Sequence, residues 1–203
     1  CFLCEVDEDT RNPDDDLESY CQDCSPRVPL DFTKGQRMLE HVAAHQLFDK
    51  TMNDAHERCG LCNRPAPACT FFLTKGRGSG ASYAIDWERS SCAREVHFQY
   101  AVAAKSKIGG KTASPCSNVP VICTTCGPKK PAPWKYNLPI HFRTFHRLDN
   151  PAMWPMDVTI SAEERSALEI IWKNIQPPVK PKKSRKARKP MKISSAHSSH
   201  LAL

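Results

Sequence analysis

The sequence is poor in glycine and in aromatic residues, and it contains no long apolar run. It has 8 glycines in 203 residues, 8% aromatic residues and a mean hydropathy of −0.53. Because a membrane-spanning helix needs about 20 consecutive apolar residues, the sequence predicts no transmembrane segment and no membrane partner. The length suits one medium domain or a few very small ones. An initiator methionine is also lacking, so we expect a fragment, in which a missing signal peptide carries no information.

Acidic residues are missing from the C-terminal end of the chain, and basic residues are scarce at the N-terminal end. Residues 177–203 contain eight bases and no acid, whereas the stretch from Glu5 to Glu18 contains eight acids and one base. The net charge of +7 therefore comes from the tail, and the rest of the chain sums to −1. We expect an acidic disordered segment over 1–20 and a basic disordered tail over 177–203. The tail predicts electrostatic attraction to nucleic acid.

A disulfide framework is disfavoured, because the chain has an odd number of cysteines, 11, and no Asn-x-Ser/Thr glycosylation site. Eight of the cysteines form four pairs with two residues between them. That spacing lets both thiolates of a tight turn reach one tetrahedral ion at about 2.3 Å, as in structural zinc sites. The sequence therefore predicts Zn²⁺ as the cofactor, with two to three ions bound. The four pairs are Cys1/Cys4, Cys21/Cys24, Cys59/Cys62 and Cys123/Cys126.

The clearest motif lies in the stretch 119–148, which predicts a zinc finger with two cysteine and two histidine ligands. A knuckle of two cysteines precedes a helix-compatible run from Asn137 to Leu148 that carries two histidines on neighbouring turns. So short a unit cannot bury enough apolar surface without metal. We expect its small core to come from Trp134, Leu138, Phe142 and Phe145. The predicted ligands are Cys123, Cys126, His141 and His146.

A second finger-like module is predicted over 21–50. A helical segment follows Thr33, and two histidines four residues apart share one face of it. The gap between knuckle and histidines exceeds the usual spacing of about 12, which implies an extra turn through Pro26 and Pro29. A four-cysteine ribbon with Cys1/Cys4 is the alternative, but two histidines at this helical spacing favour the finger. The predicted ligands are Cys21, Cys24, His41 and His45.

The middle stretch, 56–118, predicts a cysteine-rich β module. Two β-prone runs, 70–74 and 83–87, flank a glycine-rich turn and predict a hairpin, with a third strand over 95–103. The knuckle has no histidine pair downstream, so its remaining ligands must come from elsewhere in the module. We predict a four-cysteine site of Cys59, Cys62, Cys92 and Cys116, with Cys69 and His97 in reserve.

The catalytic motifs of zinc enzymes are missing. The segment His41-Val-Ala-Ala-His45 lacks the glutamate that a zinc protease uses as general base. The zinc deaminase signature is missing too. Sites with four cysteine or histidine ligands are closed, whereas catalytic zinc keeps an open position. We therefore predict structural sites, no enzyme activity and no small-molecule substrate.

A proline-rich joint and an amphipathic helix are predicted over 149–176. Ser161 and Glu164 form a capping-box pattern at the start of the helix. Glu169 and Lys173 are spaced as an ion pair on its polar side. One apolar stripe, which we expect to pack back on the body, is formed by Leu168, Ile171, Trp172 and Ile175.

Three successive segments carry a family resemblance: QRMLEHVAAH, CGLCNRPAPAC and PCSNVPVICTTC followed by WKYNLPIHFRTFH. Over about residues 21–148 the chain resembles a zinc-finger family multiplied in mushroom-forming (basidiomycete) fungi, whose members look like mobile-element-associated or nuclear proteins. The resemblance implies zinc binding at the 123–146 finger and at the earlier pairs, and little about biochemical role. A long spacer and an anchor at Trp134 distinguish the chain from ordinary DNA-reading fingers.

Base reading by the 119–148 finger is not expected, because the residues at its helix start, 134–140, are largely apolar and include a proline. Contacts to the nucleic-acid backbone are predicted instead, with low sequence specificity. The basic tail also fits a nuclear import signal, so we expect nuclear residence. The alternative is a protein-interaction adaptor that uses Trp134, Tyr136 and the 168–175 stripe. The predicted phosphate contacts are Lys135, Arg143, Arg147, Lys182, Lys183, Arg185, Lys186, Arg188 and Lys189.

These patterns together predict an α+β fold made of small zinc-stabilised modules with disordered ends. The modules are ββα-like fingers at 21–50 and 119–148, joined by the β-hairpin knuckle region of 56–118. The predicted function is zinc-dependent nucleic-acid binding in the nucleus.

Overall fold

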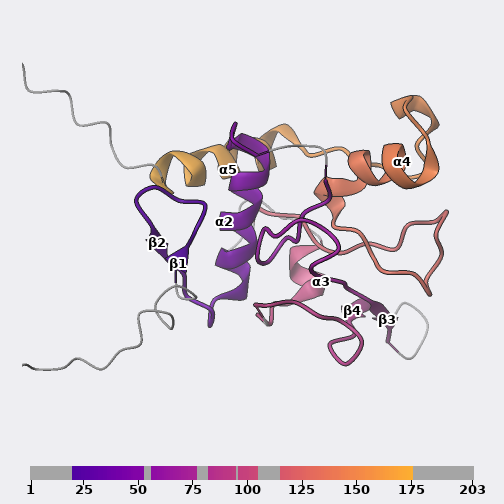
Figure 1. The fold of residues 1–203 in the computed structure, drawn as a ribbon, viewed down its shortest axis with the longest axis horizontal. Coiled ribbons are helices and arrows are strands. Elements are labelled where there is room, and N and C mark those ends of the chain that lie inside the picture. The colour runs from indigo at the N-terminus through magenta and orange to yellow at the C-terminus, as the bar shows by residue number, and fades with distance from the viewer. Residues whose placement is uncertain (1–19, 53–55, 77–81, 95, 105–114, 176–203) are drawn as a thin grey trace, which may run out of the picture.

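The structure is a computed structural model that describes residues 20–52, 56–76, 82–94, 96–104 and 115–175. Helix α2 runs through the middle of the fold, α5 packs against it, and the two hairpins lie towards opposite sides of the view (Figure 1). The predicted tail and all of the acidic segment except Tyr20 lie outside these residues. The elements in chain order are β1 (Tyr20–Cys21), β2 (Val28–Pro29), α2 (Gly35–Phe48), β3 (Leu73–Lys75), β4 (Tyr83–Ile85), α3 (Tyr100–Ala103), η1 (Lys135–Asn137), α4 (Leu138–His146), η2 (Pro151–Met153) and α5 (Ala162–Ile175).

Two antiparallel hairpins provide the sheets of the described residues, and the fold is α+β as predicted. In β1 and β2, Tyr20 pairs with Pro29 and Cys21 with Val28. Strands β3 and β4 pair from Leu73 opposite Ile85 to Lys75 opposite Tyr83, which confirms the predicted hairpin of the middle module. The first hairpin followed by α2 has the expected ββα order.

The third strand predicted over 95–103 is wrong, because the end of this segment forms the short helix α3 (Tyr100–Ala103). The backbone N–H groups of Val102 and Ala103 donate to the carbonyl of Gln99, which satisfies them locally without a neighbouring strand. Side chains fix the segment to the rest of the fold: the Tyr100 hydroxyl donates to the Pro120 carbonyl at 2.7 Å, and Ala103 is fully buried. Local hydrogen bonding and burial therefore outweigh β propensity here.

Helix α2 is the central element because it is buried on most of its circumference. Met38, Leu39 and Val42 supply apolar contacts, and His41 and His45 are buried beside them. The helix starts at a glycine because a Cβ on Gly35 would clash with the backbone carbonyl of His97. The predicted helix after Thr33 is confirmed.

The main hydrophobic core crosses the boundaries between the predicted modules. Trp134 was expected in the core of the 119–148 finger, but it is 3% exposed within the main core, edge-on to Phe71 at a ring distance of 5.0 Å. A smaller cluster of Cys123, Leu138 and Phe142 serves the finger itself. Phe145, also predicted to be core, is 63% exposed. The buried members of the main core are Met38, Leu39, Ala43, Cys59, Leu61, Phe71, Val96, Ala103, Cys116, Val119, Trp134 and Leu168.

Helix α5 packs back on the body as predicted. Leu168 is fully buried, Ile171 packs on the main core, and the ring of Trp172 lies 5.0 Å from the ring of His45. On the outer side, Lys173 and Glu169 form the expected ion pair at 2.7 Å.

The capping box at the start of α5 forms only in part. The hydroxyl of Ser161 accepts a hydrogen bond from the backbone N–H of Glu164 at 3.1 Å. The Glu164 side chain is buried and points inward, where its carboxylate accepts from the backbone N–H and the hydroxyl of Ser117 and from the hydroxyl of Tyr136. This carboxylate therefore joins α5 to two segments of the preceding chain.

We predict that Glu164→Gln lowers the free energy of unfolding of the metal-loaded protein by about 1–3 kcal/mol, because the amide places donors where three donors already converge. Urea unfolding followed by far-UV circular dichroism measures the change. Glu169→Gln is the matched control on the same helix, since it breaks only an exposed ion pair and should cost less than about 1 kcal/mol. Equal losses in the two variants would contradict the role of Glu164.

Candidate metal centres

Three groups of four cysteine or histidine side chains converge in the described residues. In each group every residue offers one ligand atom, and these atoms all lie within 4.8 Å of one another. The nine described cysteines are free, and the sulfur pairs at 3.4 and 3.7 Å are well beyond the disulfide bond length of about 2.05 Å. The groups are Cys21/Cys24/His41/His45, Cys59/Cys62/Cys69/Cys92 and Cys123/Cys126/His141/His146.

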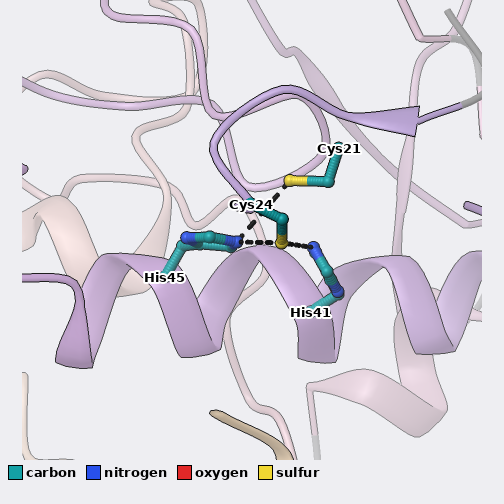
Figure 2. Close-up of side chains that lie close together, drawn as sticks. All are labelled: Cys21, Cys24, His41 and His45. Carbon is teal, nitrogen blue, oxygen red and sulfur yellow. Dashed lines mark hydrogen bonds between the residues drawn. The ribbon is translucent and has the colours of Figure 1, made fainter. Parts of the chain in front are cut away.

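The first group joins the turn after β1 to one face of α2 (Figure 2). The four-residue spacing of His41 and His45 brings both rings to the same side of the helix, facing the two sulfurs. The Nε2 atom of His45 lies 3.5 Å from Sγ of Cys21 and 3.1 Å from Sγ of Cys24, and Nε2 of His41 lies 3.6 Å from Sγ of Cys24. All four residues are buried. The structure brings together the four residues of the predicted histidine version of this module, and Cys1/Cys4 lie outside the described residues.

The middle group consists of four cysteines from two loops. The Sγ atoms of Cys59 and Cys92 are 3.7 Å apart, and those of Cys62 and Cys69 are 3.4 Å apart. Backbone N–H groups point at two of these sulfurs at 3.4 Å: Leu61 N at Cys59 and Arg94 N at Cys92. Such bonds favour thiolate over thiol, because an N–H donor stabilises the negative sulfur.

The prediction that Cys116 completes the middle group is wrong, and Cys69 takes its place. Cys116 is fully buried in the main core, where its Sγ contacts the carbonyl oxygen of Leu39 at 3.7 Å. Cys69 returns to the knuckle because the chain turns back at Pro65, whose carbonyl accepts from Ala68 N. The other reserve, His97, is exposed and packs its ring 4.8 Å from that of Trp87. The proline-rich turn directly after Cys62 was the sequence signal that favoured Cys69.

The third group has the predicted membership and lies beside α4. Sγ of Cys126 is 3.4 Å from Nε2 of His141 and 3.3 Å from Nε2 of His146, which also lies 3.3 Å from Sγ of Cys123. The two imidazole Nε2 atoms are 3.2 Å apart. The helix ends directly after His146, where Arg147 adopts a left-handed conformation with φ of 57°. Cys126 and His146 are only half-buried, so this group is the more open of the two that contain histidine.

The donor distances fit a single tetrahedral zinc ion in each group. Four donors around one such ion, at about 2.3 Å for sulfur and about 2.0–2.1 Å for nitrogen, lie roughly 3.3–3.8 Å from one another. The distances given above run from 3.1 to 3.7 Å. Sulfur and imidazole nitrogen are the donors that zinc prefers, and four of them leave no open coordination position. Each group could therefore hold one metal ion in a closed site.

Two carboxylates that the sequence patterns did not predict contact the Nδ1 atoms of two histidine ligands. Asp49 accepts from Nδ1 of His45 at 3.1 Å, and Glu57 contacts Nδ1 of His141 at 2.8 Å. A hydrogen bond at Nδ1 fixes the tautomer that leaves Nε2 free to bind a metal, and it orients the ring. Asp49 lies four residues after His45, directly after the end of α2, a spacing visible in the sequence, whereas Glu57 lies far from His141 along the chain.

Without a bound cation, the two thiols of a knuckle differ in proton affinity. Burial opposes ionisation of Cys21, but hydrogen bonds and Coulomb attraction from His41 and His45 outweigh it and lower the pKa of Cys21 to about 5. Burial and the nearby Cys21 raise the pKa of Cys24 to about 12. Burial and Cys123 likewise raise the pKa of Cys126 to about 11. Because zinc binds thiolates, loading these sites must release protons, and the affinity for zinc rises with pH.

The residues predicted to contact phosphates differ in where their side chains lie. Lys135 is turned towards the body, where its Nζ donates to the Ser117 hydroxyl at 2.8 Å. Arg143 and Arg147 are exposed on and after α4. The predicted tail residues lie outside the described part of the chain.

A comparison of the chain with protein-family models, with curated proteins and with solved structures finds no match. The resemblance to the fungal zinc-finger family therefore stays a prediction. Among the described helices, none has the length and apolar character needed to span a membrane.

We predict that Cys69→Ser removes one metal equivalent per chain, whereas Cys116→Ser leaves the metal content unchanged. The reason is that Cys69 belongs to the group of four, whereas Cys116 lies outside it in the main core, with its Sγ against the carbonyl oxygen of Leu39. Elemental analysis of the two purified variants beside the unmodified protein measures the difference. Loss of metal from the Cys116 variant alone would restore the ligand set expected from the sequence and reject the one in the structure.

A second prediction concerns Glu57, which contacts the candidate ligand His141 but is not itself a member of the third group. Glu57→Gln should weaken zinc binding at the third group by roughly 10- to 100-fold, because His141 loses its charged partner. Competition with a chromophoric chelator measures the affinity of the most weakly held ion. Glu88→Gln, an exposed carboxylate outside the three groups, is the control and should change nothing. An unchanged affinity in the Glu57 variant would contradict the bracing role.

Proposed function

We propose that the chain is a zinc-binding protein whose three closed sites hold its loops in place and which binds nucleic acid with low sequence specificity. The observation that carries the first part is the convergence of four soft donors at each of three points, at distances that suit one tetrahedral ion. Zinc is the ion that such donor sets favour. The role is structural, because four protein ligands leave no position for a substrate or a reactive water.

The second part of the proposal, nucleic-acid binding, rests on exposed basic side chains near the third metal-binding group. Arg143 and Arg147 are exposed on and after α4, and Lys129 and Lys130 are exposed in the loop that follows the knuckle. These side chains suit phosphate contacts.

Base reading by the start of α4 is disfavoured, because the positions that would approach base edges are occupied inside the fold. Asn137 is 5% exposed and donates through its side chain to the carbonyl of Arg58. Leu138 and Trp134 are buried in the two apolar clusters. The proposal is therefore sequence-tolerant binding, strengthened by the eight basic residues of the tail.

Three side chains on which the adaptor hypothesis was based are buried or hydrogen-bonded within the fold. Trp134 is 3% exposed, and Leu168, the first residue of the 168–175 stripe, is fully buried. The hydroxyl of Tyr136 is held by Glu164 at 2.6 Å. Nucleic-acid binding is therefore the better supported proposal, and the basic tail together with reduced, metal-binding thiols favours nuclear residence.

We predict that binding to a labelled oligonucleotide weakens steeply with salt. The logarithm of the binding constant should fall linearly with the logarithm of salt concentration, by roughly 0.7–0.9 for each phosphate contact, since each contact releases a condensed counterion. A variant with the eight tail bases replaced by glutamine should bind more weakly and show a flatter slope at unchanged zinc content. Fluorescence anisotropy measures both. Salt-independent binding, or an unchanged slope in the tail variant, would contradict the proposal.

A further inference from the structure

A groove of about 610 Å³ lies between the middle and the third metal-binding groups. Its two walls come from residues 57–71 and 125–146. Candidate ligands of both groups line it: Cys59 and Cys69 from the middle group, and Cys126, His141 and His146 from the third. The groove therefore depends on two separate loops being held in register by their metal sites. Neither predicted module forms it alone.

The lining of the groove is mostly apolar and aromatic. Phe71 and Trp134, which belong to the main core, are part of the lining, and prolines occur on both walls. Phe145 also lines the groove, with 63% of its surface exposed and its ring 5.1 Å from the ring of His141. This helical residue was predicted as core, so its exposure needs a different explanation. An exposed aromatic ring beside a groove is a stacking platform for a planar group.

Two residues that line the groove each carry a buried nitrogen atom without a hydrogen-bond partner among the described residues. The two atoms are Nε of Arg58 and Nε1 of Trp134. Folded proteins leave few buried donors unpaired, because each costs free energy. Neither nitrogen atom is exposed at the surface, so the choice of occupant depends on the exposed side chains of the lining.

The charges around the groove favour an anionic occupant. Arg64 and Lys130 are exposed and line it, and neither forms an ion pair within the described part of the chain. The one carboxylate in the lining, Glu57, is engaged with Nδ1 of His141 at 2.8 Å. A neutral proline-rich peptide would use the apolar walls but would leave both exposed cations without a partner.

We propose that this groove receives an unstacked base of single-stranded nucleic acid, with the ring of Phe145 stacked on the base and Arg64 and Lys130 placed for the flanking phosphates. The inference rests on the proposed function and makes it more specific, because it selects single strands over duplexes. In a duplex, bases are stacked and paired, and they cannot enter a groove of this kind without being flipped out. Base stacking on an aromatic ring tolerates every base, which agrees with low sequence specificity.

The test compares three ligands of equal charge on the zinc-loaded full-length chain: a thymidine 12-mer, a 12-mer of abasic residues and a hairpin duplex. The thymidine strand should bind at least about fivefold more tightly than the abasic strand, since stacking of a single base contributes that much. Phe145→Ala should abolish this difference and leave the zinc content unchanged, because the side chain is exposed. Tyr83→Ala, which removes a partly exposed aromatic residue outside the groove, is the matched control and should retain the difference.

The outcomes separate this inference from the proposed function. If all strands bind in a salt-dependent way, with equal affinity for thymidine and abasic strands or an unchanged preference in the Phe145 variant, the groove is not a base site and the proposed function stands. If no oligonucleotide binds, both proposals are overturned. A proline-rich peptide that displaces the thymidine strand and needs Phe145 for its own, salt-independent binding would identify a peptide groove and overturn the inference.

Discussion

Soft donors from distant parts of this chain converge on three points in the described residues. The first group ties the turn after β1 to α2, the middle group ties two loops of the same module, and the third ties a knuckle to α4. Each group brings buried or half-buried donors within 4.8 Å of one another, thiols alone in the middle group and thiols with imidazoles in the other two. Such an arrangement needs a cation to offset the charge when the thiols are ionised. The apolar core and these groups are interleaved, since Cys59 belongs to both and the ring of Trp172 in α5 packs on His45.

This interleaving changes how the fold should be understood. Isolated zinc fingers fold independently. Here Trp134, although it lies within the 119–148 finger in sequence, packs in a core shared with α2, the middle module and α5. Glu164 adds a polar link, since its carboxylate joins α5 to Ser117 and Tyr136. The groove between the middle and third groups follows from the same arrangement. Metal sites, core and candidate binding surface thus depend on one another.

Local patterns in the sequence predicted much of the structure, and long-range contacts account for the rest. The knuckles, the helices that carry the histidines and the stripe of α5 were predictable, because ligand spacing and helical periodicity act over a few residues. The presence of Cys69 in the middle group, in place of the predicted Cys116, was not predictable from local patterns. It depends on which loop folds back to the Cys59/Cys62 pair. Glu57 meets His141 from far along the chain, and the inward turn of Glu164 requires Ser117 and Tyr136 to be in place. The helix at Tyr100–Ala103 replaced a predicted strand because its side chains are anchored on the core.

The central claim is that metal ions at these three groups maintain the fold, and native mass spectrometry of the full chain combined with chelator titration tests it most directly. We expect three zinc ions per chain, one for each group, and a loss of cooperative unfolding by circular dichroism as a strong chelator removes them. A chain that carries no metal and still unfolds cooperatively, or one whose cysteines are joined in disulfides as isolated, would contradict the account.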